Sequence, residues 1–214
     1  MRNSIKPLDD DQIAAFLEAI QGHRLENLYR VVLFTGMREG EALGLTWDCV
    51  DLDTGSILIN KQLQRKRDGT GEYMLVSTKN GKSRTITAAP SVVSILRAVR
   101  TRQREWQLKS GGLWDNPLNL VFTNEIGQPL SDHTVYKNFK SIVGRIGSPE
   151  TRFHDLRHSY AVAAIRAGDD IKTVQGNLGH ATAAFTLDVY GHVTDQMKQE
   201  SADRMEAFIQ RVTG

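Results

Sequence analysis

The chain has 214 residues, of which 40% are hydrophobic and 24% charged, with a formal net charge of +2. This composition argues against a disordered chain, and no apolar run approaches the about 20 residues that a membrane span requires. The N-terminus lacks the apolar core of a signal peptide, and a single cysteine, Cys49, excludes an internal disulfide. We therefore expect a soluble protein of a reducing compartment such as the cytoplasm.

Positive charge is concentrated in one part of the sequence. Between Lys61 and Lys109 there are 12 Lys and Arg residues against three acids, so the remaining residues carry a net negative charge. Such asymmetry can form a basic face that binds the phosphates of a polyanion, although a solvated charged helix beside a lysine-rich hairpin explains it equally well. The positions predicted to form this DNA-binding face are Lys61, Arg65, Lys66, Arg67, Lys82 and Arg84.

Helical periodicity dominates the first 50 residues. The pattern predicts a helix over 8–20, capped by Asp9 or Asp10 and closed by Gly22. A second helix is expected over 25–34, and a short one over 37–47 after the Thr35-Gly36 break.

The apolar period changes to two between residues 56 and 88, which predicts three short antiparallel strands. The Asn80-Gly81 pair marks a hairpin turn, and it places Lys79 at an exposed tip. A lysine there is either a solubilising residue or one that swings in to touch a ligand.

The remainder is again helical. Pro90 suits the first turn of a long helix to about 108, and further helices are expected over 132–146, 153–167, 171–178, 182–190 and 195–211. Without internal repeats or a convincing linker, the sequence predicts one mostly helical α+β domain with a small three-stranded antiparallel sheet.

Arg38 and Glu41 are three residues apart in the short third helix and share a face. They would form either a surface ion pair or an arginine aimed at a phosphate and held by the carboxylate. Spacing alone leaves both readings open.

The segment from His154 to Tyr190 combines two imidazoles, a guanidinium and a phenol at helix edges. His154 and Arg157 lie near a helix N-terminus, where backbone N–H groups favour an anion. His154 and His158 also have the spacing of two zinc ligands. No cysteine cluster or obvious third ligand accompanies them and Arg157 adds a cation, so we expect no metal.

Phosphodiester cleavage by a tyrosine suits this set better. It requires positive charge for the non-bridging oxygens, an acceptor for the phenol proton, and a proton donor for the leaving 5′-oxygen. Arginine suits phosphate oxygens, while His and Lys can transfer protons. A covalent phosphotyrosine conserves the bond energy, so the break can be resealed.

Four blocks in order, TGMREGEALGL, STKNGKSRTI, FHDLRHSYA and NLGHATAAFTLDVYGH, resemble the tyrosine recombinase (phage integrase) family. The resemblance covers the chain from its first helix to about Tyr190. Within the family, the chain most resembles integrases of bacterial phages and conjugative transposons. The resemblance implies the tyrosine recombinase catalytic fold, a bacterial DNA-associated enzyme, no cofactor, and integration or excision of a mobile element by site-specific recombination.

The resemblance also implies residue roles. Arg38 and Arg157 are the two catalytic arginines, Glu41 is the helical companion of Arg38, and His180 holds a non-bridging oxygen. Tyr190 is the nucleophile that forms a 3′-phosphotyrosyl link.

Proton transfer completes the set. His154 assists removal of the phenol proton, Lys79 protonates the 5′-oxygen, and His158 gives structural support. No member of the set is replaced, so we expect a competent enzyme.

Family integrases usually carry an N-terminal core-binding domain, often preceded by an arm-binding domain. Both are expected to be absent here, with a catalytic domain over 1–194 and a helical tail over 195–214 that contacts a neighbouring protomer. The implied partners are double-stranded DNA, other protomers in a tetrameric synapse and an accessory directionality factor, with no membrane. Type IB topoisomerase-like DNA relaxation and a DNA-binding module with vestigial chemistry are the alternatives.

Overall fold

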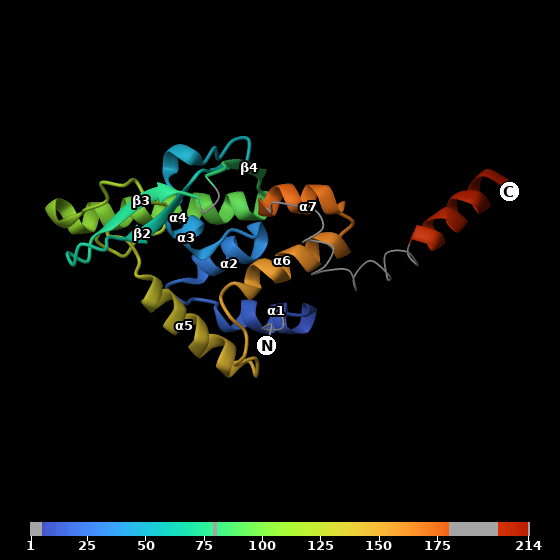
Figure 1. The fold of residues 1–214 in the computed structure, drawn as a ribbon, viewed down its shortest axis with the longest axis horizontal. Helices are drawn as coiled ribbons and strands as arrows, with labels where there is room; N and C mark the ends of the chain where they lie inside the picture. The colour runs from blue at the N-terminus through green and yellow to red at the C-terminus, as the bar shows by residue number, and fades with distance from the viewer. Residues whose placement is uncertain (1–5, 79–80, 180–200, 214) are drawn as a thin grey trace. The chain divides into compact units, whose positions relative to one another are not determined.

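The structure is a computed structural model that describes residues 6–78, 81–179 and 201–213 (Figure 1). Contacts divide the chain into two compact units, Met1–Tyr160 and Ala161–Gly214, which are described separately. The predicted division into a domain over 1–194 and a tail over 195–214 remains a prediction.

Three helices open the first unit, as the sequence predicts. Helix α1 (Asp10–Ala19) is capped by Asp9, whose carboxylate accepts from the Gln12 N–H at 2.8 Å. Helix α2 (Glu26–Thr35) ends at Gly36, whose φ of 64° is a left-handed conformation that glycine adopts readily. The chain then turns into the short helix α3 (Glu39–Leu43), so Gly36 sets the direction in which Arg38 leaves α2.

The small sheet differs in detail from the prediction. Four strands form two antiparallel pairs: β1 (Ser56–Ile59) with β4 (Arg84–Thr87), and β2 (Lys61–Arg65) with β3 (Tyr73–Ser77). The expected first strand is interrupted at Asn60, and its two halves pair with different partners. The alternation of side chains continues across Asn60, so the sequence pattern does not reveal the break.

Helix α3 packs against β2, and the contact depends on Gly44, which follows α3. A Cβ atom at Gly44 would lie 2.4 Å from the backbone nitrogen of Leu63 and 2.7 Å from the carbonyl carbon of Gln62. The absence of a side chain therefore lets the backbones of α3 and β2 approach closely.

Two longer helices complete the framework of the first unit. Helix α4 (Pro90–Ser110) packs on α2, and α5 (Asp132–Arg145) packs on α1 and α3. Single-turn 3₁₀ helices lie at Trp47–Cys49 and Gly111–Leu113. Figure 1 shows α2 between α4 on one side and α1 on the other, with the strands beside α3 and α4.

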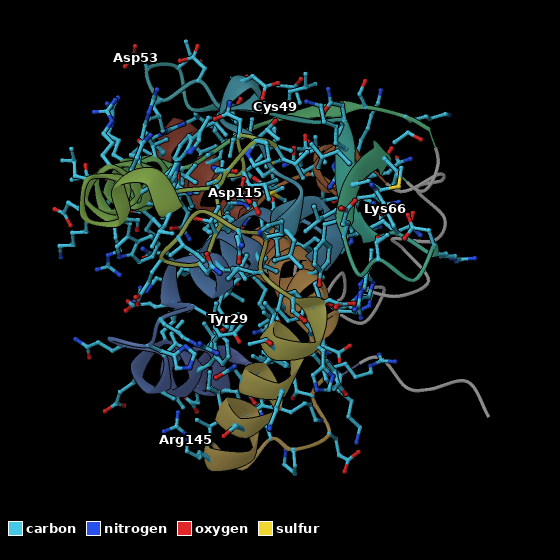
Figure 2. All side chains as sticks on the ribbon, turned by 90° about the vertical axis from the view of Figure 1, so that its left-hand side faces the viewer. Tyr29, Cys49, Asp53, Lys66, Asp115 and Arg145 are labelled. Carbon is cyan, nitrogen blue, oxygen red and sulfur yellow. The ribbon has the colours of Figure 1, made fainter. Side chains whose placement is uncertain are left out.

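The core contains an aromatic cluster between α1, α2 and α5. The rings of Phe16 and Phe139 lie 5.8 Å apart, those of Phe139 and Phe153 5.3 Å apart, and Tyr29 contacts all three. The hydroxyl of buried Tyr29, labelled in Figure 2, donates to the Val135 carbonyl at 2.9 Å. Because Phe153 directly precedes His154, this cluster anchors the chain next to the candidate site.

Helix α6 (Asp155–Arg166) begins in the first unit and ends in the second. In the second unit, α7 (Ile171–Leu178) is capped by Asp170, which accepts from the Thr173 N–H at 2.9 Å, and ends at left-handed Gly179. Residues 201–213 are also helical and agree with part of the predicted 195–211 helix. The expected helix over 182–190 lies outside the described residues. None of the described helices is long and apolar enough to cross a membrane.

Candidate active site

The turn between α2 and α3 presents Arg38 next to a buried carboxylate. Glu41, which is 1% exposed, accepts from the Arg38 backbone N–H at 2.9 Å through Oε2 and from Arg38 Nη1 at 2.7 Å through Oε1. The side chain of Arg38 remains 25% exposed. Among the described residues, neither Nη2 nor Nε of Arg38 has a hydrogen-bond partner, so part of the guanidinium can donate to a ligand.

Arg84, the first residue of β4, binds the same carboxylate although it lies 43 positions after Glu41 in the sequence. Its Nη1 donates to Glu41 Oε1 at 3.0 Å and its Nη2 to Glu41 Oε2 at 2.6 Å. Arg84 is 10% exposed on its side chain, and its guanidinium is occupied by a bidentate pair. Arg84 is one of the positions predicted for the basic face, and its side chain is mostly enclosed next to Arg38 and Glu41.

The charge of Glu41 is set by these neighbours. Burial alone would raise its pKa, but hydrogen bonds from Arg84 and Arg38 outweigh burial and lower the pKa to about 2. Glu41 is therefore an anion throughout the physiological range, which favours a fixed position for both guanidinium groups.

Arg157 comes to the same turn from α6. It is 1% exposed, and its Nη1 donates to the Gly36 carbonyl at 2.7 Å. Since Gly36 lies two residues before Arg38, this bond attaches the second arginine to the turn that carries the first. The two arginines are 119 positions apart in the sequence, and the fold brings them to one place.

The turn before α6 positions His154. Asp155 accepts from the Arg152 backbone N–H at 2.8 Å and from Arg152 Nη2 at 2.9 Å, which closes the turn around His154. Although His154 is exposed at the surface, desolvation by neighbouring protein atoms and the charges of Arg157 and Arg38 lower its pKa. His154 is thus close enough to both arginines to respond to their charge.

His158 lies one turn after His154 on α6. Their ring centroids are 4.9 Å apart with nearly perpendicular planes, and His158 is 4% exposed. Burial, followed by the neighbouring His154, lowers the pKa of His158 to about 4. Within the described ranges, no group of three or more His, Cys, Asp or Glu residues could hold a metal ion.

Lys79, His180 and Tyr190 lie outside the described residues. Thr78, Gly81 and Lys82 are described, however: Thr78 Oγ1 donates to the Lys82 carbonyl at 2.7 Å, and the Gly81 N–H donates to the Thr78 carbonyl at 2.8 Å. His180 directly follows Gly179, the left-handed cap of α7.

The remaining basic-face positions divide into two groups. Lys61 is paired with Asp48 at 3.2 Å and Lys66 with Glu72 on the β2–β3 ribbon, where Figure 2 labels Lys66. Arg65, Arg67 and Lys82 are exposed. These three are the better candidates for contacts with a polyanion.

Sequence reasoning missed two supporting contacts. The Arg84–Glu41 pair spans 43 positions and has no signature in local spacing. Asp155 lies three residues after Arg152, a capping spacing that could have identified the turn around His154.

Comparisons with known proteins identify the family of this chain. Residues 6–197 match the model of the Phage integrase family. A relative from Caldanaerobacter subterraneus subsp. tengcongensis, named Tyrosine recombinase XerC-like, is 31% identical over 96% of this chain and 55% of its own length. The ICEBs1 integrase of Bacillus subtilis is 24% identical over 97% of this chain and 56% of its own. The chain spans about half the length of the curated relatives it matches.

Solved structures show the same fold. The Tn1549 transposon integrase in complex with transposon right end DNA superposes with a TM-score of 0.78 at 24% identity, covering 96% of this chain and 67% of that chain. The catalytic domain of bacteriophage HP1 integrase gives 0.59 at 21% identity, with 89% of each chain covered. These matches confirm the predicted mostly helical fold with a small antiparallel sheet. The chain therefore belongs to the phage integrase family, the tyrosine recombinases that its sequence motifs resemble.

Proposed function

We propose that this chain carries the catalytic domain of a site-specific DNA recombinase that cleaves and rejoins DNA without a metal, for integration or excision of a mobile element. The observation that carries the proposal is the meeting of Arg38, Arg157 and His154 at the turn after α2. Two guanidiniums and an imidazole at one place suit a phosphodiester, whose charge they can neutralise.

The two arginines divide the work of binding the phosphate. Arg38 keeps part of its guanidinium available while Glu41 fixes the rest, so it can donate to a non-bridging oxygen. Arg157 supplies a second positive charge that is held by the Gly36 carbonyl and shielded from solvent. In this proposal His180 donates to a non-bridging oxygen as well.

Proton transfer accompanies both bond changes. The oxygen of Tyr190 attacks phosphorus and loses its proton with the help of His154, whose lowered pKa keeps it mainly neutral at about pH 7. The bond to the 5′-oxygen breaks, and Lys79 gives that oxygen a proton. The reverse sequence, with a 5′-hydroxyl from another strand as nucleophile, rejoins the DNA and frees Tyr190.

DNA binding and assembly extend the proposal beyond the catalytic residues. Exposed Arg65, Arg67 and Lys82 suit backbone phosphates. The helix over 201–213 exposes Met205, Phe208, Ile209 and Val212 at helical spacing, which suits docking on a neighbouring protomer in a tetrameric synapse. An accessory directionality factor is a further proposed partner, and the bacterial cytoplasm is the proposed location.

The test uses nicked duplexes with a randomised core, which trap the covalent intermediate because the short strand diffuses away. The proposal predicts a protein–DNA adduct that forms with wild type, persists in chelator, and is abolished by Tyr190→Phe. Loss of the adduct in chelator, or its formation by Tyr190→Phe, would refute the mechanism.

The same preparation separates the alternatives. When two intact duplexes that carry a captured sequence are supplied, a recombinase should join them into Holliday junctions. Relaxation of supercoiled plasmid without junction products would instead support a type IB topoisomerase. Binding without any adduct would support a module with vestigial chemistry.

A further inference from the structure

We propose that Arg84 is a positioning residue that, through Glu41, fixes the catalytic guanidinium of Arg38 and anchors the strand that follows the Lys79 loop. This inference rests on the proposed function and deepens it. It assigns Arg84 to the support of two catalytic groups and removes it from the DNA-binding face.

The hydrogen bonds around Glu41 distinguish the roles of the two arginines. Arg84 directs both terminal nitrogens at the Glu41 carboxylate, whereas Arg38 uses only Nη1 and its backbone N–H. The side chain of Arg84 is also more buried, at 10% exposed against 25% for Arg38. Arg84 therefore suits holding the carboxylate, and Arg38 suits reaching the phosphate.

A carboxylate held from two sides has less freedom to rotate than one held from one side. With Oε1 and Oε2 each accepting from Arg84, the plane of the Glu41 carboxylate is fixed by a rigid fork. Oε1 also receives Arg38 Nη1, so the plane of the carboxylate determines where the Arg38 guanidinium lies. Without Arg84, Glu41 can turn and Arg38 can follow it.

Arg84 is also close in sequence to Lys79. It begins β4, where it pairs with Ile59 of β1, and it is five residues after Lys79. The intervening turn is tied by the Thr78–Lys82 and Gly81–Thr78 hydrogen bonds. A shift of Arg84 is therefore expected to move the base of the lysine loop as well as Arg38.

The experiment compares single-turnover cleavage by wild type, Arg84→Lys and Arg84→Gln on a captured nicked substrate. Arg84→Gln removes the charge and the fork, and we expect cleavage to slow by roughly 10- to 100-fold, with DNA affinity unchanged at fixed salt. Arg84→Lys keeps the charge without the fork and should fall between the two. Arg30→Gln, which breaks the 2.8 Å Arg30–Glu26 pair on α2, is the matched control and should cleave like wild type.

A second substrate separates the two positions that Arg84 supports. A 5′-bridging sulfur leaves without the proton that Lys79 would supply, so it bypasses only the acid. Arg84→Gln should regain part, but not all, of its lost rate on this substrate, because Arg38 stays misplaced.

The outcomes are distinguishable from failure of the proposed function. If wild type forms no adduct, the proposed function fails; if wild type cleaves and folded Arg84→Gln cleaves at the same rate, only this inference fails. A loss of DNA affinity equal to the loss of rate would identify Arg84 as a phosphate contact and also overturn it. If Arg84→Gln does not fold by circular dichroism, Arg84→Lys decides, since wild-type cleavage by that variant would refute a role for the fork.

Discussion

Replacing Glu41 with glutamine removes a negative charge that is only 1% exposed and that accepts hydrogen bonds from the guanidiniums of both Arg38 and Arg84. A carboxyl whose pKa falls from 4.5 to about 2 favours its ionised form by about 3 kcal/mol. Removing one partner of a buried ion pair typically costs about 3–5 kcal/mol, because the remaining charge is left buried. We therefore expect Glu41→Gln to lower the free energy of unfolding by about 3–5 kcal/mol, or Tm by roughly 10 °C.

The pH dependence follows from the direction of the shift. The pKa of Glu41 is lowered in the folded state, so its contribution is present above about pH 4.5 and is lost as the pH falls towards 2. The difference between wild type and Glu41→Gln should accordingly be largest near neutral pH and shrink in acid.

Urea unfolding followed by tryptophan fluorescence at several pH values measures this difference. Glu26→Gln is the matched control, because Glu26 pairs with Arg30 at 2.8 Å but the two side chains are 24% and 28% exposed. An exposed helical pair of this kind contributes less than about 1 kcal/mol. A Glu41→Gln variant no less stable than Glu26→Gln, or a difference independent of pH, would refute the reasoning.

Three further predictions concern other groups. Arg157→Lys keeps the charge but loses the bond to the Gly36 carbonyl, so adduct formation should slow by about 100-fold in single-turnover assays, and wild-type rates would contradict its role. Burial and nearby Asp132 raise the pKa of Glu39 to about 7. The folded state therefore loses stability as the pH rises from about 4.5 to about 7, where Glu39 becomes charged in its partly buried position. Glu39→Gln should then raise the free energy of unfolding by up to about 3 kcal/mol at about pH 8 but little near pH 4, and an equal gain at both would count against this. DNA affinity should fall steeply with salt in fluorescence anisotropy, with a shallower slope for Arg67→Gln; a flat response would exclude the basic face.

Local patterns in the sequence were sufficient for most helices and for the contact between Arg38 and Glu41. The Asp9 cap of α1 and the face shared by Arg38 and Glu41 depend on residues three apart, and the structure has both. The ends of α2 at Gly36 and of α7 at Gly179 can also be predicted, because glycine is the residue that most readily adopts the positive φ of a helix C-cap.

Long-range contacts were not accessible in the same way. The pairing of β1 with β4 and of β2 with β3 depends on where the chain breaks, and the alternating pattern around Asn60 does not mark that position. Similarly, Arg84 lies on a predicted hairpin, where an arginine is expected to be exposed. Its partner, the Glu41 carboxylate, lies 43 positions earlier, so local spacing does not reveal the pair. The convergence of Arg157 with Arg38 came from family resemblance, since spacing alone placed them on separate helices.

The central claim is that the oxygen of Tyr190 becomes covalently joined to the phosphate at the 3′ end of the cleaved DNA strand. Mass spectrometry of the protease-digested adduct, together with end-labelling of the released DNA, tests it most directly. We expect a nucleotide attached to the peptide that contains Tyr190, and a free 5′-hydroxyl on the released strand. Attachment to another residue, or a link to the 5′ end of the DNA, would contradict it.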